Sequence, residues 1–417
     1  MPSVVVVGLQ WGDEGKGKVA AYLSKGARLA VRYNGGPNAG HTVVYSGRTF
    51  RMHLIPAGGL VCGRAAICSG VYVDLRTLAE ELRESREVRP DLKVVLSPRA
   101  QVITELALRA EELLESMRGE RAIGTTRRGI GPTAVERFGR VGLRVADLLE
   151  RETLKEKLGD IAAFWRLEGS DLDAMAESLS EQFMSLDLEV AEVSRVIRDH
   201  LTSGGTVVFE GAQGTMLDVY YGTYPYVTSS VTTSAGVSPG CGVPVRWVDS
   251  VVGVAKAYTT RVGAGPFPTE LHGDAAERIR STGGEYGATT GRPRRIGWLD
   301  LVQLKFATDL NGTDRIFLTR IDTLSGLTGL KVCTAYEGYK DGDYPVTLSE
   351  LSKVRPVYAE LEGWPVIDDV QRTTIVREGY GALHPNARRY VEFLEEHLGT
   401  PVKQIGIGPG VEDVVER

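Results

Sequence analysis

The sequence is poor in the residues that mark secreted, zinc-bound or membrane-spanning proteins. Its 417 residues include four cysteines with no C-x-x-C spacing and no paired histidines, at Cys62, Cys68, Cys241 and Cys333. We therefore expect buried or free thiols in a reducing compartment and no structural zinc site. No long apolar run occurs, and no charged leader precedes the first predicted strand. These two features predict a cytoplasmic protein without a membrane span.

An excess of positive charge is also missing. The formal net charge is −5 and the pI is near 5.8. This balance argues against a general nucleic-acid binder or a polybasic membrane anchor, so we expect no nucleic-acid or membrane partner. Any site for an anion must be local. With 42% hydrophobic and 25% charged residues, the chain can bury a substantial core.

Short apolar runs alternate with helical ones, which is typical of an α/β fold. The first run, Val4–Val7, predicts a strand buried on both faces. Further strands are predicted at 29–31, 93–96, 206–209 and 315–318, and helices over most of 76–118 and 148–201. We expect one domain over 1–417, built as a large, mostly parallel central sheet with flanking helices and a P-loop-like nucleotide site. The interpretation of 148–201 is a solvated helical layer over the sheet.

The first predicted strand leads into a glycine-rich loop with the spacing G-x-x-x-x-G-K from Gly12 to Lys18. In such a loop, backbone N–H groups turn toward a phosphate and a lysine adds positive charge. A helix over 18–23 would place the loop at its positive end. Val19 stands where these loops normally carry the Ser or Thr that binds magnesium. A metal must therefore find another oxygen, and Asp13 is the nearest candidate.

Four further loops carry polar residues suited to anions. Residues 33–42 are rich in Gly, Asn and Pro and contain His41, for which a catalytic and a loop-bracing role are equally compatible with its position. Residues 123–132 combine two threonines with two arginines, as a phosphate or carboxylate site requires, although a solvated basic loop has the same composition. Residues 210–215 follow a predicted strand, where ligands collect in parallel sheets. Residues 222–230 are dense in hydroxyls.

Two more features lie toward the C-terminus. Three arginines in four residues, at 292, 294 and 295, follow two threonines and can clamp more than one anionic group. Asp322 comes just after the predicted strand 315–318. Its carboxylate could accept hydrogen bonds from the N1–H and exocyclic amine of guanine, or it could cap a helix.

Together these motifs resemble those of the adenylosuccinate synthetase family. The resemblance rests on six segments in the family's order: 12–18, 38–42, 124–126, 210–214, 222–225 and 289–295. It implies a homodimeric α/β enzyme of purine synthesis, in the branch leading to AMP. Such an enzyme joins IMP to L-aspartate with GTP and Mg²⁺, through 6-phosphoryl-IMP, and forms adenylosuccinate, GDP and phosphate.

The resemblance also implies roles for individual residues. Asp13 would remove the N1 proton of IMP, His41 would act as an acid toward the β/γ-phosphates, and Mg²⁺ would bind Asp13 and the Gly40 carbonyl. The implied GTP contacts are Gly12, Gly15, Lys16, Gly17, Lys18, Gly40, Thr42, Arg294, Arg320, Asp322, Gly406 and Gly408. The implied IMP contacts are Asp13, Asn38, Thr126, Gln213, Thr228, Arg292 and, from the second subunit, Arg140. The implied aspartate contacts are Thr289, Thr290, Arg292 and Arg294.

The chain departs from the family pattern at several positions. The family usually has lysine at Arg320, and its C-terminal segment usually reads Ser-x-Gly-Pro followed by arginine, whereas 406–410 here lacks that hydroxyl and that charge. Arg127 replaces a usual glycine, Val231 a usual asparagine, and Gln101 stands at a variable position. These changes keep open a related ligase that uses a guanine monophosphate such as dGMP as the aspartate acceptor.

An interpretation from another class is a GTP-binding regulatory protein that uses the same loop and Asp322. It needs neither IMP nor aspartate. Val19 in the magnesium position and three separate anion-binding loops argue against it, because a switch protein has no second substrate to hold.

Overall fold

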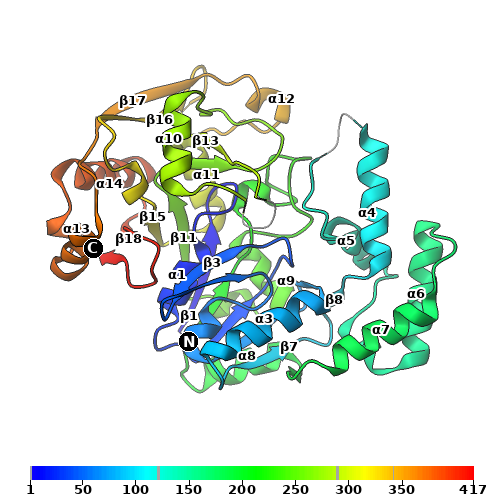
Figure 1. Cartoon of the computed structure of the whole chain (residues 1–417). Helices are drawn as coiled ribbons and strands as arrows, with labels where there is room; N and C mark the ends of the chain where they lie inside the picture. Colours follow the sequence, from blue (N-terminus) through cyan, green and yellow to red (C-terminus); the bar gives the residue numbers. More distant parts are fainter. Residues whose placement is uncertain (1, 120–122, 288–290, 341) are drawn as a thin grey trace.

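A ten-stranded sheet forms the centre of the computed structural model, which describes residues 2–119, 123–287, 291–340 and 342–417 (Figure 1). The strand order is β19-β18-β15-β11-β1-β10-β2-β5-β7-β9. All neighbours pair in parallel except β18 and β19. The strands are β1 (Ser3–Gly8), β2 (Leu29–Arg32), β5 (Arg64–Ile67), β7 (Lys93–Leu96), β9 (Glu189–Val190), β10 (Val207–Glu210), β11 (Ser250–Lys256), β15 (Arg315–Thr319), β18 (Val402–Gly406) and β19 (Val414–Glu416). The large, mostly parallel sheet predicted from the sequence is confirmed.

The valine run of β1 lies in the middle of this sheet, between β10 and β11. Val5 and Val7 pack into the core on one face, and Val6 packs into the core on the other face. All three side chains are fully buried. The two-sided burial that the β-branched run predicts is therefore confirmed, and it places the loop after β1 at the centre of the molecule.

Helices cover both faces of the sheet. They are α1 (Lys16–Leu23), α2 (Gly58–Cys62), α3 (Leu75–Val88), α4 (Glu105–Arg118), α5 (Ile130–Gly139), α6 (Arg151–Trp165), α7 (Leu172–Met184), α8 (Val193–Thr202), α9 (Val237–Cys241), α10 (Asp274–Gly283), α11 (Leu301–Asn311), α12 (Leu348–Leu351), α13 (Asp369–Glu378) and α14 (Pro385–Leu398). Helices α8, α9, α10, α11 and α14 share one hydrophobic core, and α2, α3, α4, α6 and α7 share the other.

Short strands complete the fold as hairpins and ladders beside the main sheet. They are β3 (His41–Tyr45), β4 (Arg48–Met52), β6 (Tyr72–Val73), β8 (Gln101–Val102), β12 (Thr259–Arg261), β13 (Arg295–Gly297), β14 (Leu299–Asp300), β16 (Gly329–Tyr336) and β17 (Pro356–Glu362). The β3-β4 hairpin brings His41 beside α1, and the β12-β13 pair brings the arginine-rich loop toward the same place. Both pieces border the carboxyl ends of the central strands.

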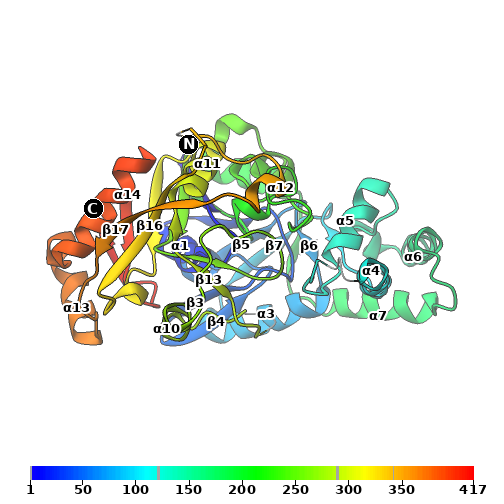
Figure 2. The same cartoon turned by 90° about the horizontal axis from the view of Figure 1, so that it is seen from above.

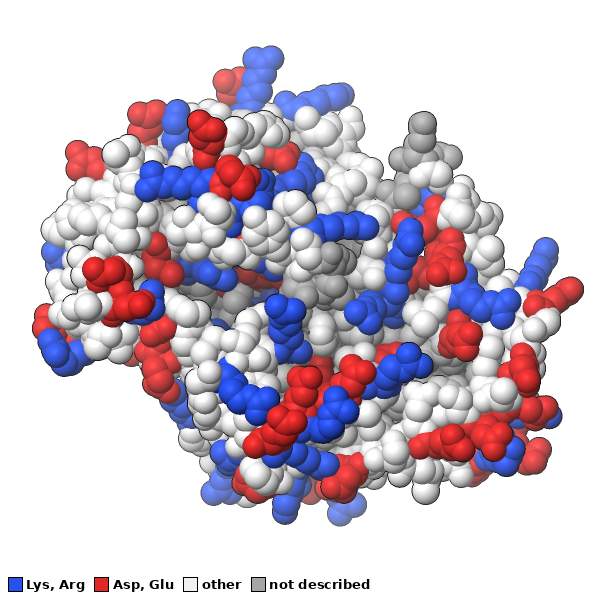
Figure 3. Space-filling view, in the orientation of Figure 1, with Lys and Arg blue, Asp and Glu red and all other residues white. Residues whose placement is uncertain are grey.

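The segment 148–201 is helical, with the short strand β9 before α8. Only α8 packs on the centre of the sheet, through Val193, Ile197 and Leu201. Helices α6 and α7 pack on each other, and with α4 and α5 they lie to the right of β5 and β7 in Figure 2. Acidic and basic side chains are interspersed over the visible face of these helices and of the main body (Figure 3). The inclusion of residues 148–201 in a single domain over 1–417 stays a prediction.

The four cysteines have the free or buried thiols that the sequence predicts. All four are free, and Cys68, Cys241 and Cys333 are buried. A bilayer-crossing helix is not found in the described ranges, since none of their helices combines the needed length with the needed apolarity.

Candidate active site

The glycine-rich loop joins the end of β1 to the start of α1. Gly12 and Gly15 have φ values of 86° and 94°. A residue with a side chain could adopt this backbone conformation only at an energetic cost. A Cβ on Gly17 would lie 2.8 Å from the Cβ of His41, so this glycine lets the first turn of α1 approach β3. Val19 is fully buried in the apolar core with Val6 and Phe317. The position that usually supplies a magnesium ligand is here part of the core.

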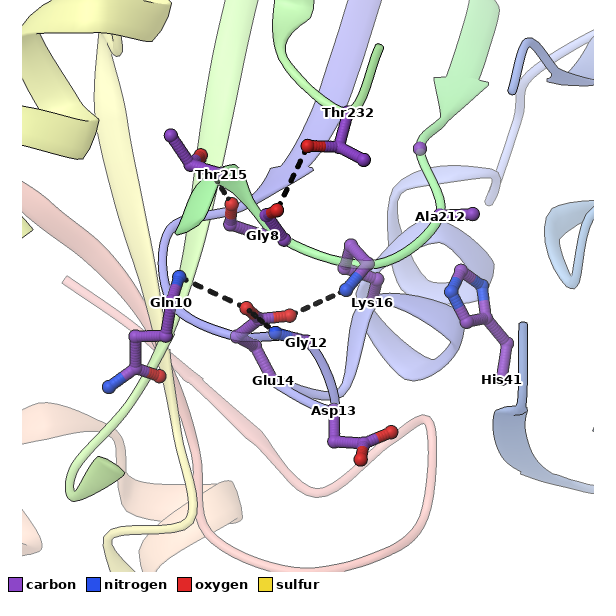
Figure 4. Close-up of polar contacts among 12 residues, drawn as sticks. Gly8, Gln10, Gly12, Asp13, Glu14, Lys16, His41, Ala212, Thr215 and Thr232 are labelled. Atoms are coloured by element: carbon purple, nitrogen blue, oxygen red, sulfur yellow. Dashed lines mark hydrogen bonds and ion pairs between the residues drawn. The ribbon is translucent and has the colours of Figure 1, made fainter. Parts of the chain in front are cut away.

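The loop contains a buried carboxylate, Glu14, that the motif alone did not single out (Figure 4). Its Oε1 accepts hydrogen bonds from the backbone N–H of Gln10 at 3.0 Å and of Gly12 at 2.9 Å. Its Oε2 pairs with Lys16 Nζ at 2.5 Å. Both side chains are almost completely buried. Glu14 thus satisfies loop amides and balances the loop lysine from inside.

The neighbouring acid, Asp13, points away from the Glu14 carboxylate (Figure 4). Its φ of 61° is rare for a residue with a side chain, and its side chain is 28% exposed. Its Oδ2 lies 2.8 Å from Nε of Arg294. Asp13 is therefore accessible to a ligand and already held beside a cation.

Arg294 belongs to a buried charge cluster around Glu285, which the sequence analysis missed. The Glu285 carboxylate contacts Arg294 Nη1, and its Oε1 lies 2.9 Å from Lys256 Nζ and 2.5 Å from the hydroxyl of Tyr258. Burial raises the pKa of Glu285, but Lys256, Arg294 and Arg320 outweigh it and hold that pKa at about 2. Burial lowers the pKa of Lys256 to about 8 against the opposing effect of Glu285. Glu285 directly precedes the arginine-rich loop, which is the signal that could have identified it.

His41 is held by a second buried pair. Its Nδ1 lies 2.5 Å from Oε1 of Glu210, which also lies 2.9 Å from Nη2 of Arg32. Burial and the nearby Arg32 lower the pKa of His41 to about 4, although Glu210 opposes this shift. His41 is therefore neutral near pH 7 in the site as it stands. A carboxylate on one ring nitrogen fixes the orientation of the other.

Asp13, Lys16 and His41 border a cavity of about 340 Å³ beside the loop. Of the predicted site residues it brings together Gly12, Asp13, Lys16, Asn38, Gly40, His41, Thr126, Gln213 and Thr228. Asn38 donates to the Thr228 hydroxyl at 3.2 Å. Within the described chain, both polar atoms of the Gln213 amide, Asn38 Oδ1 and Thr125 Oγ1 are buried without a hydrogen-bond partner. Such atoms are costly unless a polar ligand pairs with them.

Unusual backbone conformations gather at the predicted site. Seven non-glycine residues in the described ranges have positive φ, and four of them are predicted site residues: Asp13, Arg140, Gln213 and Arg320. Arg127, the departure from the family's glycine, is a fifth, with a φ of 53°. Strain of this kind persists where the surrounding structure enforces it, often at functional positions.

The predicted guanine end lies outside this cavity, at the ends of β15 and β18. Asp322 follows β15 in a short 3₁₀ turn, and its Oδ1 is buried with no partner in the described residues. It is therefore not satisfied as a helix cap. Lys18 Nζ donates to the carbonyl oxygens of Gly408 at 2.7 Å and Asp413 at 2.8 Å. The second loop lysine thus ties the phosphate loop to the C-terminal segment.

Other predicted residues lie elsewhere. Arg140 and Arg292 are exposed, as is Thr42. Arg140 directly follows the end of α5, close in sequence to the exposed Phe138. Thr289 and Thr290 lie outside the described residues. Gln101 is buried and Val231 is half-buried.

The fold and the site together define an α/β nucleotide-binding enzyme whose phosphate loop carries its own exposed carboxylate. The family model described as "Adenylosuccinate synthetase" matches residues 5–415. An adenylosuccinate synthetase of Halothermothrix orenii is 45% identical over 432 residues, covering 100% of this chain and 99% of that protein. The structure of a fully ligated adenylosuccinate synthetase from Plasmodium falciparum is 34% identical, has a TM-score of 0.92 and covers 99% of both chains. The chain belongs to the adenylosuccinate synthetase family.

A more distant structure bears on the alternative acceptor. The succinoaminodeoxyadenylate synthetase of cyanophage S-2L, bound to dGMP and dATP, is 22% identical with a TM-score of 0.64 over 100% of this chain and 95% of that one. At this identity the likeness shows the fold alone. The comparisons favour neither the dGMP-type ligase nor the regulatory protein.

Proposed function

We propose that the protein joins IMP and L-aspartate at the expense of GTP, giving adenylosuccinate, GDP and phosphate. Membership of the synthetase family along nearly the whole chain supports this reaction. The observation that carries it within the molecule is the placement of Asp13. A carboxylate on the phosphate loop faces a cavity that also contains His41, the unpartnered amide of Gln213 and the unpartnered Oδ1 of Asn38.

The reaction needs a base beside the purine ring. Asp13 takes the N1 proton of IMP, and the electron pair moves to O6, which attacks the γ-phosphorus of GTP while GDP leaves. The aspartate amine then attacks C6, inorganic phosphate departs with O6, and the amine gives up its proton. Arg294 Nε lies 2.8 Å from Asp13 Oδ2 and holds the carboxylate in place beside the cavity.

His41 acts on the phosphate side of the same step. In the free site it is neutral, because burial and Arg32 lower its pKa to about 4. The negative charge of bound phosphates would favour its protonated form, so His41 gains its acid role when GTP arrives. Glu210 holds the ring in place during this change.

The donor set suits Mg²⁺. The Asp13 carboxylate and the Gly40 carbonyl are hard oxygens that border one cavity. No group of three His, Cys, Asp or Glu side chains able to hold a metal occurs in the described ranges, so phosphate oxygens and water would complete the shell. When bound, the ion neutralises charge on the transferring phosphoryl group.

The remaining contacts follow the family pattern. For IMP we propose Asn38, Thr126, Gln213, Thr228 and Arg292, with Arg140 supplied by the partner of a homodimer. For aspartate we propose Thr289, Thr290, Arg292 and Arg294. For GTP we propose Gly12, Gly15, Lys16, Gly17, Lys18, Gly40, Thr42, Arg294, Arg320, Asp322, Gly406 and Gly408. A cytoplasmic location and the absence of nucleic-acid and membrane partners remain predictions from the sequence.

The test is an assay of the purified protein with GTP, Mg²⁺, IMP and aspartate. We expect adenylosuccinate and aspartate-dependent phosphate release in equal amounts. Replacing IMP with GMP or dGMP should abolish both, whereas product formation with dGMP would favour the alternative ligase. GTP hydrolysis that does not depend on IMP or aspartate would contradict the ligase function and favour a regulatory protein.

A further inference from the structure

The C-terminal segment 406–410 borders the predicted guanine site with few side chains of its own. It reads Gly-Ile-Gly-Pro-Gly, so it offers no side-chain hydrogen-bond donor. Asp322, across from it, has a buried oxygen without a partner in the described chain. A carboxylate can accept from the N1–H and 2-amine of guanine, but it cannot recognise the acceptors O6 and N7 on the same base. That edge of the base needs donors, which are either backbone N–H groups of this segment or a side chain from elsewhere in the chain.

Lys18 is the first cation to consider as this donor, but its ammonium group is already hydrogen-bonded to the backbone. Its Nζ donates to two backbone carbonyls, that of Gly408 in the C-terminal segment and that of Asp413 just after it. A Cβ on Gly406 would lie 3.3 Å from the same Nζ. Lys18 therefore stabilises the conformation of the segment 406–410.

Arg372 approaches the segment from α13. Its Nε donates to the carbonyl of Ile407 at 3.1 Å, and its Nη1 lies 2.9 Å from Asp369 Oδ1. A Cβ on Gly408 would lie 2.6 Å from both Cδ and Nε of Arg372, so only glycine allows this close packing. The side chain is 23% exposed. The Cδ–Nε part of the Arg372 side chain is thus fixed against the segment, while the outer part of the guanidinium can still contact a ligand.

The charge of Arg372 acts on Asp322. Burial raises the pKa of Asp322, and the cations that lower it are Arg320, Lys18 and Arg372. Arg372 also lowers the pKa of Lys18, after burial and Arg320. One buried carboxylate and three cations therefore share the guanine end, and Arg372 comes from outside all six sequence motifs.

We propose that Arg372 is a nucleotide-binding residue that donates to the O6 and N7 edge of guanine, opposite the edge that Asp322 accepts from. A guanidinium matches these two acceptors with its planar fork, and adenine, with an amine in place of O6, does not. Arg372 thereby supplies a side-chain donor, which the glycine-rich segment 406–410 lacks. The inference rests on the proposed use of GTP, and it extends that function to base specificity.

The test measures GDP and ADP binding by calorimetry on full-length wild type and the variants Arg372→Met and Arg372→Lys. Methionine keeps apolar packing near Gly408, and lysine keeps the charge without the fork. We expect Arg372→Met to weaken GDP binding about tenfold or more, with a smaller loss for lysine and little change for ADP. Arg377→Met is the matched control, because Arg377 lies on the same helix and pairs with the exposed Glu378; it should bind GDP as wild type does.

Analogues separate base contact from loop packing. 7-deaza-GDP lacks N7, and 6-thio-GDP carries a weaker acceptor than O6. If Arg372 contacts the base, at least one analogue should bind wild type more weakly, and that difference should shrink in Arg372→Met. An equal loss for GDP and both analogues would mean that Arg372 only braces the segment and would overturn the inference. Wild type that binds ADP as well as GDP would instead overturn the proposed GTP preference, and the inference with it.

Discussion

The guanidinium of Arg294 joins Asp13 to Glu285. Its Nε lies 2.8 Å from Asp13 Oδ2, and its Nη1 contacts the Glu285 carboxylate. The pKa of Arg294 is lowered by burial but raised overall by these two carboxylates. The phosphate loop and the arginine-rich loop are thus coupled through one cation shared by an exposed acid and a buried one.

Glu285→Gln should destabilise the fold because it leaves Lys256 and Arg294 buried without their common counter-ion. Loss of one partner of a buried pair typically costs about 3–5 kcal/mol. Urea unfolding measures the change. Glu360→Gln is the control, since Glu360 and Lys331 form an exposed pair for which about 0–1 kcal/mol is expected. Equal, small effects of both substitutions would contradict the role given to Glu285.

Asp13→Ala and His41→Asn should lower turnover far more than they weaken IMP binding. Both side chains act on charge that develops during proton and phosphoryl transfer, so we expect losses in kcat of about 100- to 10,000-fold. Steady-state kinetics and IMP binding by calorimetry separate the two effects. Parallel losses in binding and rate would point to a structural role.

Glu136 on α5 should make folding stability depend on pH. It is buried, accepts a hydrogen bond from Trp165 Nε1 at 2.8 Å, and its Oε2 has no partner in the parts of the chain described. Burial raises its pKa from 4.5 to about 7. Between these values the folded state keeps a proton that the unfolded state has released, so stability falls as pH rises, by up to about 3 kcal/mol.

Glu136→Gln removes this titration while keeping an oxygen for Trp165. Urea unfolding at pH 5 and pH 8 should therefore show a smaller decline for the variant than for wild type. The contributions of other titrating groups to the pH dependence are the same in both proteins, so they cancel in the comparison. An identical decline in both proteins would show that Glu136 ionises normally.

Subunit mixing tests the contribution of Arg140 across a dimer. Asp13→Ala and Arg140→Met should each be nearly inactive, yet a mixed dimer has one site with a native Asp13 and a native Arg140 from its neighbour. Random mixing should restore about a quarter of wild-type activity. If activity stays at the level of the separate variants, Arg140 serves its own subunit or none.

The sequence predicted the parts of the site that depend on local spacing. Patterns within about a dozen residues were enough to identify the valine run, the glycine-rich loop, His41 and Asp322. The central strand and the burial on both its faces are confirmed.

The buried acids could not be predicted in the same way. Glu210 meets Arg32 and His41 because β10 pairs with β2, and Glu285 meets Lys256 because β11 ends beside the arginine-rich loop. These pairings are long-range consequences of strand order, which local periodicity does not contain. Arg372 was missed for the same reason, since α13 reaches the C-terminal segment only in the folded chain.

The carboxylate of Glu14 gives the phosphate loop a permanent internal anion. Glu14 pairs inside the protein with the backbone N–H of Gly12 and with the ammonium of Lys16, and this pairing holds the shape and the charge balance of the loop. An incoming phosphate meets a preorganised surface and need not order the chain around itself, which limits the conformational entropy lost on binding. Product release likewise leaves behind a loop that is ready for the next catalytic cycle.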